Sequence, residues 1–201
     1  DAGTPGISDP GEDLVRICYE QGIEVTSLPG AAACITALTL SGLPTRRFSF
    51  EAFLPKEKKE RAAVLEELKN DTRTLIVYEA PHHLLGTLKE LQNALGDRRL
   101  TVCRELTKKF ETAFQTTFSE AIRYYEEQGV RGECVLVIEG RSREELVQEA
   151  QQSWEAISVE EHMEHYLSTG MDRKSAMKQV AKDRGVGKRE IYQMLLKAEN
   201  E

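Results

Sequence analysis

The 201-residue sequence has little proline and no long apolar segment. Its 6 prolines and 14 glycines are too few for a collagenous or low-complexity chain, and its 40% hydrophobic and 30% charged residues are typical of a globular protein. The longest stretch without a charged residue, 25–45, is interrupted by Pro29-Gly30 and by Gly42-Leu43-Pro44. Because a bilayer requires roughly 20 consecutive apolar residues, we expect no membrane span.

Cysteine and histidine are also scarce. The four cysteines, at positions 18, 34, 103 and 134, form no C-x-x-C pair and lie in apolar or strand-like segments. We therefore expect reduced core thiols of a cytosolic protein rather than a zinc site. His162 and His165 lie three residues apart in a charged segment, where we expect a solvated helix face and no metal site. For His82-His83, which follows Pro81, we expect a capping or surface role.

Strands and helices alternate through residue 140, which predicts an α/β fold. Runs of apolar or alternating residues predict strands over 23–28, 48–54, 74–78, 100–106, 113–118 and 134–138. Apolar residues at helical spacing predict one helix that begins after Ser8-Asp9-Pro10 and ends at Gly22, and further helices over 31–41, 56–68, 84–95 and 119–128.

The strands stop after residue 142, and the rest of the sequence has helical patterns. Helices are predicted over 144–153, 159–168, 173–184 and 189–198, with Gly170 and Gly185-Val186-Gly187 as the breaks. The apolar spacing on either side of the second break favours a helix-turn-helix unit in a small three-helix bundle. A plain helical hairpin for packing or dimerisation fits the pattern equally well.

The formal net charge of -7 is distributed unevenly. Residues 171–201 hold eight Lys or Arg against five acidic residues, whereas residues 1–170 hold nineteen against twenty-nine. This basic end is compatible with nucleic-acid contact through Lys182, Lys188 and Arg189, although a solvated helix face explains the charge count as well.

Two common phosphate-binding signatures are absent. No G-x-G-x-x-G follows a strand, and the segment 185–189 lacks the spacing of a P-loop, which disfavours nucleoside triphosphate chemistry. Instead, the small residues and prolines of 1–11 precede a helix, and the segment 29–33 repeats this pattern before a second helix. Such loops let backbone approach a ligand closely, and the two could face one crevice at the carboxyl ends of strands. Ordinary turns between strands and helices fit either loop taken alone.

Several motifs occur in the order found in one known family. They are the segments 1–5 (Asp-Ala-Gly-Thr-Pro), 8–11 (Ser-Asp-Pro-Gly), 28–30 (Leu-Pro-Gly), 42–44 (Gly-Leu-Pro), 53–55 (Phe-Leu-Pro), 74–79 (Thr-Leu-Ile-Val-Tyr-Glu), 104–108 (Arg-Glu-Leu-Thr-Lys) and 132–133 (Gly-Glu). The sequence over residues 1–140 thereby resembles the ribosomal RNA small subunit methyltransferase I family, and the basic helical end resembles that family's helix-turn-helix end. The resemblance places it among tetrapyrrole methylase-like enzymes.

The resemblance implies a two-domain α/β fold of the tetrapyrrole methylase type with S-adenosyl-L-methionine held between the domains. Residues 1–46 would be the remainder of the N-terminal cofactor domain, 47–142 the second α/β domain, and 143–201 a helical linker and RNA-binding tail. The implied cofactor-binding residues are Asp1, Ala2, Gly3, Thr4, Pro5, Ile7, Pro29, Gly30, Ala31, Ala32, Ala33, Tyr78, Glu79, Ala80, Gly132, Glu133 and Cys134.

The implied reaction is 2'-O-methylation of a cytidine in the decoding region of 16S rRNA, within the small ribosomal subunit. Glu79 and Glu105 are the candidate proton acceptors, because both follow apolar strands where desolvation favours the protonated carboxyl. Salt bridges to Arg104 or Lys108 are an equally good explanation of these two carboxylates. Lys108 is a further catalytic candidate, and Arg104, Lys108 and Lys109 form a cationic cluster suited to RNA phosphate.

Two other functions remain open from the sequence. A tetrapyrrole methyltransferase would share the cofactor cleft but would not need a basic helical tail. A non-catalytic nucleic-acid-binding protein would need the tail but would not need the two small-residue loops. The family's first strand and its Thr-Pro-Ile-Gly-Asn loop do not precede Asp1 in this sequence, so we expect the chain alone to be inactive and to expose apolar surface over 14–18 and 31–40. We also expect a homodimer.

Overall fold

The computed structural model describes residues 3–198, which form two compact units. Among these residues, the first unit ends at Arg141 and the second begins at Ser142. The boundary between residues 46 and 47 stays a prediction. Within the described residues, no helix is both long and apolar enough to cross a membrane.

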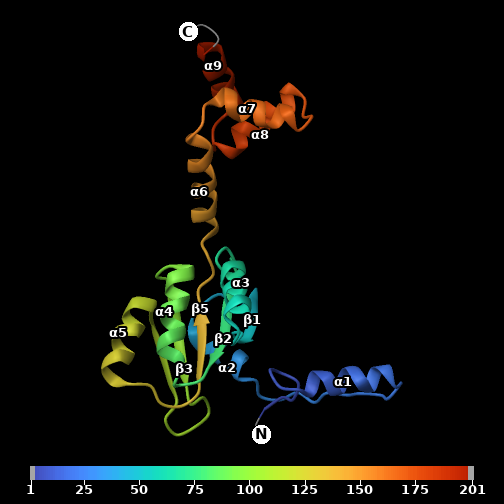
Figure 1. Ribbon diagram of the computed structural model, residues 1–201, viewed down its shortest axis with the longest axis vertical. Helices are drawn as coiled ribbons and strands as arrows, with labels where there is room; N and C mark the ends of the chain where they lie inside the picture. Colours follow the sequence, from blue (N-terminus) through green and yellow to red (C-terminus); the bar gives the residue numbers. More distant parts are fainter. Residues whose placement is uncertain (1–2, 199–201) are drawn as a thin grey trace. The chain divides into compact units, whose positions relative to one another are not determined.

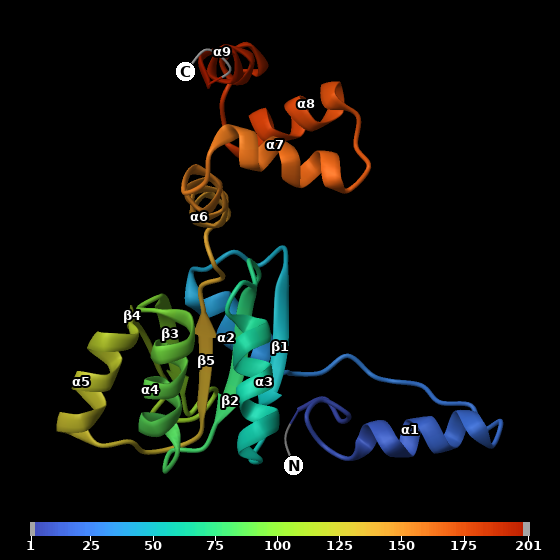
Figure 2. The ribbon, with the colours of Figure 1, turned by 45° about the horizontal axis from the view of Figure 1, so that its top comes forward.

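The first unit is built on a five-stranded sheet with the order β1-β2-β5-β3-β4 (Figures 1 and 2). The strands are β1 Phe48–Phe53, β2 Thr74–Glu79, β3 Arg99–Arg104, β4 Thr112–Thr117 and β5 Cys134–Ile138. β1 and β2 are parallel, and the other neighbours are antiparallel. β5 lies at the centre of the sheet, and all five of its residues are buried, as expected of a continuous apolar run covered on both faces.

Helices cover both faces of this sheet, so the predicted α/β fold is confirmed. On one face lie α3 Lys58–Leu68, α4 Leu84–Leu95 and α5 Phe118–Gln128, and the leucines of α4 pack on Leu75 and Val77 of β2. On the other face, α2 Ala33–Ser41 packs Cys34, Ala37 and Leu38 on the sheet. The small residues of α2 allow this close approach to the strands.

The segment before α2 differs from the sequence prediction. The helix α1 Gly11–Glu20 is present, but none of its residues is buried, so Cys18 is not a core thiol, whereas the other three cysteines are buried. Residues 23–28 are not a strand, and Ile23 and Leu28 are 56% and 79% exposed. Apolar alternation over 23–28 predicted a strand, but a strand also needs a hydrogen-bonding neighbour, and the structure places none beside this segment among residues 3–198.

The second unit contains four helices: α6 Arg143–Glu155, α7 Val159–Ser168, α8 Arg173–Asp183 and α9 Lys188–Ala198. Side-chain caps at Ser142, Ser158 and Asp172 begin the first three of them, and Ser158 forms a capping box with Glu161. α7, α8 and α9 share one apolar core that includes Ala176, Val180 and Ile191. The predicted three-helix bundle is therefore confirmed, with α8 and α9 as the helix-turn-helix pair.

His162 is buried in this unit, so the expected solvated face is wrong for this residue, although His165 is exposed. The His162 ring stacks on Trp154 with centroids 3.9 Å apart. Arg184 Nε donates to His162 Nδ1 at 3.2 Å, so Nε2 carries the proton of the neutral ring and faces Asp183 Oδ2 at 3.4 Å. The sequence did not predict this packing, because the neighbouring Glu161 and Glu164 are typical of a solvent-exposed helix face.

Acid is expected to destabilise the helical unit through His162. Burial, with Arg184 and His165 adding to its effect, lowers the pKa of His162, while Asp183 acts in the opposite direction. The unfolded chain then binds this proton more readily, so the free energy of unfolding falls as the pH drops from the ordinary value of 6.5 through the lowered pKa. Urea unfolding at several pH values, followed by fluorescence of the single tryptophan, Trp154, measures this fall.

Two phenylalanine variants control this measurement. His162→Phe keeps an aromatic ring against Trp154 but removes the titrating group, so the pH-dependent fall is expected to disappear. His165→Phe is expected to retain it, because His165 is exposed. An unchanged fall in His162→Phe would assign the pH dependence to another group.

Candidate functional site

One end of the sheet brings together the predicted residues of the first unit. The register pairs Glu79 with Cys134 and Cys134 with Arg104, while Phe53 pairs with Tyr78. The carboxyl ends of β1, β2 and β3 therefore lie at the same end of the sheet as the start of β5. Ala80 and Glu105 follow β2 and β3 directly, and Gly132 and Glu133 precede β5.

Tyr78 joins this end of the sheet to the start of α2. The backbone N–H of Cys34 donates to Tyr78 Oη at 3.0 Å, and the Tyr78 ring contacts Phe50 edge to face. Burial, reinforced by the contact with Cys34, raises the pKa of Tyr78 to about 12, so the hydroxyl is neutral at physiological pH. The predicted segment Ala31, Ala32 and Ala33 thus lies next to Tyr78, and Ala32 packs in the same apolar cluster.

The two small-residue loops lie against each other, and that they face one crevice stays a prediction. Thr4 N donates to Ala31 O at 2.8 Å. A Cβ on Gly3 would lie 2.8 Å from Ala31 O, and one on Gly30 would lie 2.9 Å from Thr4 Oγ1. Only glycine allows this approach at Gly3, where φ is +104°. Asp1 and Ala2 lie outside the described residues.

A pocket of about 510 Å³ adjoins the first loop. Ile7 lines it, together with Gly6, Ser8, Asp9, Pro10, Glu12, Phe50 and Ala52. Asp9 holds the loop in shape, because its carboxylate accepts from the backbone N–H groups of Gly6 and Gly11. The predicted residues Pro5 and Pro29 lie in these two loops without lining this pocket.

Glu79 lies on the opposite face of the sheet from Tyr78 and the loops. Its exposed fraction is 7%, and it accepts from Ala80 N at 2.8 Å and from Thr87 Oγ1 at 2.5 Å. Cys134 points to the same face, and burial raises its pKa to about 12, so its thiol is protonated. Any contact of Cys134 with a ligand at the Tyr78 face would therefore come from its backbone.

Glu105 forms the ion pair that the sequence left as an alternative. Lys108 Nζ lies 3.3 Å from Glu105 Oε1 and 3.5 Å from Glu133 Oε2, and these carboxylates raise the pKa of Lys108. Glu133 N donates to Glu105 Oε1 at 3.2 Å. The Glu105 side chain packs directly on Gly132 and leaves no room for a Cβ there. Glu105 is thus held by a lysine, a backbone N–H and a glycine.

The predicted cationic cluster of Arg104, Lys108 and Lys109 has less unpaired positive charge than the sequence suggested. Two carboxylates balance Lys108, while Arg104 donates to Thr112 Oγ1 and to Arg131 O. Lys109 is exposed, with Nζ 5.5 Å from the centre of the Phe110 ring.

In the helical unit, the three predicted RNA-binding residues surround one turn. Lys182 lies in the last turn of α8, and Lys188 and Arg189 begin α9. All three are exposed and form no ion pair with the residues that the structure describes. They are free to contact phosphate.

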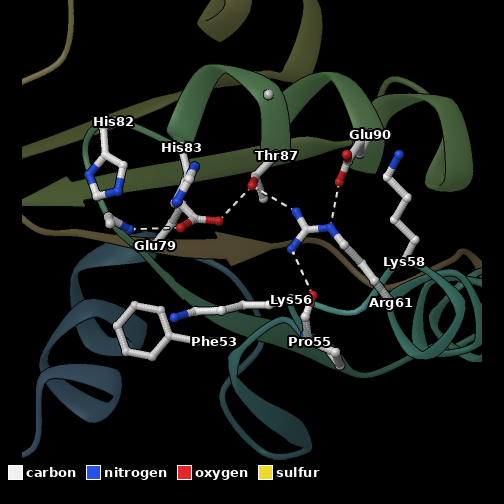
Figure 3. A pocket seen from close by; sticks show the side chains of 12 residues that line it. Phe53, Pro55, Lys56, Lys58, Arg61, Glu79, His82, His83, Thr87 and Glu90 are labelled. Atoms are coloured by element: carbon white, nitrogen blue, oxygen red, sulfur yellow. Dashed lines mark hydrogen bonds and ion pairs between the residues drawn. The ribbon is translucent and has the colours of Figure 1, made fainter.

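The sequence interpretation missed a second pocket, of about 540 Å³, on the α3–α4 face of the sheet (Figure 3). It is lined by Phe53, Pro55, Lys56, Lys58, Arg61, Glu79, Ala80, His82, His83, Gly86, Thr87 and Glu90. His82 and His83 are exposed, as expected. The charged run 56–61 was a signal for this pocket, but it was interpreted only as the start of a helix.

Comparison with known proteins gives one consistent family. Residues 1–122 match the family described as tetrapyrrole (corrin/porphyrin) methylases. The chain is 47% identical over 192 residues to the ribosomal RNA small subunit methyltransferase I of Halalkalibacterium halodurans, with 96% of this chain and 66% of the relative covered. The relatives of the same name from Bacillus subtilis and Synechocystis sp. are 48% and 44% identical, over 96% and 99% of this chain and 65% and 70% of their own. The chain thus spans about two thirds of their length.

Solved structures agree on the fold. A cobalt precorrin-4 methyltransferase of cobalamin biosynthesis has a TM-score of 0.51 at 19% identity, covering 68% of this chain and 61% of its own. The methyltransferase CobJ has a TM-score of 0.53 at 20% identity, covering 68% and 62%. At this identity the likeness extends to the fold alone.

Proposed function

Because the chain belongs to the tetrapyrrole methylase family and, within it, to the ribosomal RNA small subunit methyltransferase I family, we propose that the protein is an rRNA methyltransferase. We propose further that it uses S-adenosyl-L-methionine to methylate the 2'-hydroxyl of a cytidine in the decoding region of 16S rRNA. The observation that carries the proposal is 44–48% identity to relatives of that name over nearly the whole chain.

The geometry of the first loop supports a cofactor site. Gly3 and Thr4 touch Ala31, the loop adjoins a pocket of about 510 Å³, and small-molecule sites span roughly 300–1,000 Å³. The residues therefore fit a ligand of the size of S-adenosylmethionine. In the proposal, the loops 3–7 and 29–33 contact it through backbone, and Tyr78 and the segment 132–134 close the site.

The chemistry needs positioning and one proton acceptor. When bound, S-adenosylmethionine supplies a methyl group on a positively charged sulfur: the carbon–sulfur bond breaks as the carbon–oxygen bond forms, and the bonding pair stays on sulfur. The ribose hydroxyl loses its proton to a carboxylate. Glu79 and Glu105 are the candidates, and the Lys108 pair would orient Glu105.

In this proposal, exposed lysine and arginine side chains bind the RNA partner. Lys109, Lys182, Lys188 and Arg189 offer charge to phosphate, while Arg104 and Lys108 are already engaged within the protein. The small ribosomal subunit as the context of this RNA, and a homodimer as the active form, belong to the same proposal. Sedimentation of the purified protein tests the dimer.

Because we expect the chain alone to be inactive, the enzyme assignment is tested by calorimetric titration of the full-length protein with S-adenosylmethionine, which is expected to show saturable binding. Glu79→Gln is expected to keep this affinity, because the Glu79 carboxylate lies on the opposite face of the sheet from the two loops, and Glu105→Gln is expected to keep it as well. The variant that lacks the proton acceptor loses roughly 10²–10⁴-fold in methyl transfer. A protein that binds RNA but no S-adenosylmethionine would instead be a non-catalytic RNA-binding protein. Full methyl transfer in both glutamine variants would exclude both carboxylates as the acceptor.

A further inference from the structure

The pocket on the α3–α4 face has a rigid polar floor (Figure 3). Arg61 Nη2 donates to Thr87 Oγ1 at 2.8 Å, and Thr87 donates in turn to Glu79. Arg61 Nε pairs with Glu90 Oε2 at 2.5 Å. Each charged group of the floor therefore already has a partner, and Arg61 and Glu90 offset each other.

The rim of the pocket carries positive charge without partners. Lys56 and Lys58 are exposed and form no ion pair with any residue that the structure describes. Lys58 is the first residue of α3, where the helix dipole disfavours a cation. These two lysines therefore do not stabilise the fold locally, and they are suited to an anionic ligand.

The rim also presents aromatic rings. Phe53 lies at the end of β1, where it is 56% exposed and its ring also contacts the Tyr78 ring edge to face. Across the pocket, the exposed rings of His82 and His83 lie 4.1 Å apart (Figure 3). Aromatic rings beside lysines form the arrangement that binds single-stranded nucleic acid, in which rings stack on bases and cations contact phosphates.

We propose that this pocket binds one unstacked nucleotide of the RNA substrate. Its base lies against Phe53 and the His82–His83 pair, and its phosphate lies against Lys56 and Lys58. The inference rests on the proposed function, because that function makes RNA the substrate. The pocket includes Glu79 and Ala80, so the nucleotide is held at the same end of the sheet as the proposed cofactor site but on the opposite face.

A matched pair of charge reversals tests the phosphate contact. Lys58→Glu is expected to weaken binding of a short single-stranded RNA on the order of fivefold and to reduce the salt slope by about 0.7. Lys59→Glu changes the same charge in the same helical turn outside the pocket, and is expected to have little effect. Fluorescence anisotropy of the labelled RNA with the 201-residue chain measures both.

Two more variants test the base contact. Phe53→Ala is expected to weaken binding roughly 5- to 150-fold, the range for loss of one stacked base. Gly86→Leu places a side chain in the pocket, where a Cβ at Gly86 meets no atom within 4 Å. Because leucine favours the helix over glycine, Gly86→Leu is expected to stay folded, and its circular dichroism spectrum checks this.

The outcomes separate the pocket from the proposed function. Equal effects of Lys58→Glu and Lys59→Glu, or full RNA affinity in Gly86→Leu, would overturn the pocket and leave the proposed function intact. Pocket variants that lose a free mononucleotide or inorganic phosphate but keep RNA would show a small-ligand site and also overturn it. A wild-type chain that binds no RNA would contradict both.

Discussion

Replacing Gly3 by valine is expected to lower the affinity for S-adenosylmethionine roughly 10- to 100-fold. The new Cβ would lie 2.8 Å from Ala31 O, and valine would have to adopt a φ of +104°. A strained backbone of this kind costs about 1–3 kcal/mol, and relief of the strain moves the loop away from Ala31. The Thr4 N–Ala31 O hydrogen bond that joins the two loops is then lost. Calorimetric titration of the variant in the full-length protein measures the effect.

Gly22→Val is the matched control for backbone strain. Gly22 also has a positive φ, of +67°, but a Cβ there meets no atom within 4 Å, and the residue follows α1 outside the two loops. We expect this variant to keep its cofactor affinity. Equal affinity losses in both variants would mean that backbone strain anywhere in the N-terminal segment is enough to weaken cofactor binding. Unchanged affinity in Gly3→Val would show that the two loops are not part of the cofactor site.

Reversing the three exposed cations around the turn between α8 and α9 is expected to weaken RNA binding on the order of tenfold or more. In Lys182→Glu, Lys188→Glu and Arg189→Glu combined, three phosphate contacts are lost, and the slope of log affinity against log salt falls by about 2. S-adenosylmethionine affinity is expected to stay unchanged. Anisotropy titrations with rRNA at several salt concentrations measure the slope.

The control reverses three exposed cations of the other unit that form no ion pair with the residues that the structure describes, Arg46, Lys59 and Arg123, which gives the same change in net charge. We expect a smaller change in salt slope from this control. An unchanged slope in the tail variant would assign α8 and α9 to packing or dimerisation, which the sequence left as an alternative.

The central strands of the sheet could be predicted because the residue pattern within each strand is enough to indicate it. β2 and β5 are continuous apolar runs, and α4 repeats leucines at helical spacing, so these elements matched the prediction within a few residues. Residues 23–28 show the limit of this reasoning, because alternation describes a strand's faces but not its neighbours. His162 shows another limit, since its burial depends on Trp154 and Arg184 from other helices.

The part of the candidate site that depends on glycine backbone conformation could be predicted from the sequence. Gly3 and Gly30 marked loops that need close approach, and the structure brings these loops into contact. The pocket lined by Phe53, Lys58 and His83 was not predictable, because its residues come from separate segments that only the packing of α3 and α4 on β2 brings together.

Mass spectrometry of small-subunit rRNA from a strain that lacks the gene tests the central claim most directly. The account predicts that one cytidine of the decoding region loses its 2'-O-methyl group, and that re-expression of the protein restores it. If 16S rRNA from the deletion strain is methylated as in the parent, the assignment of rRNA ribose methylation to this protein is contradicted.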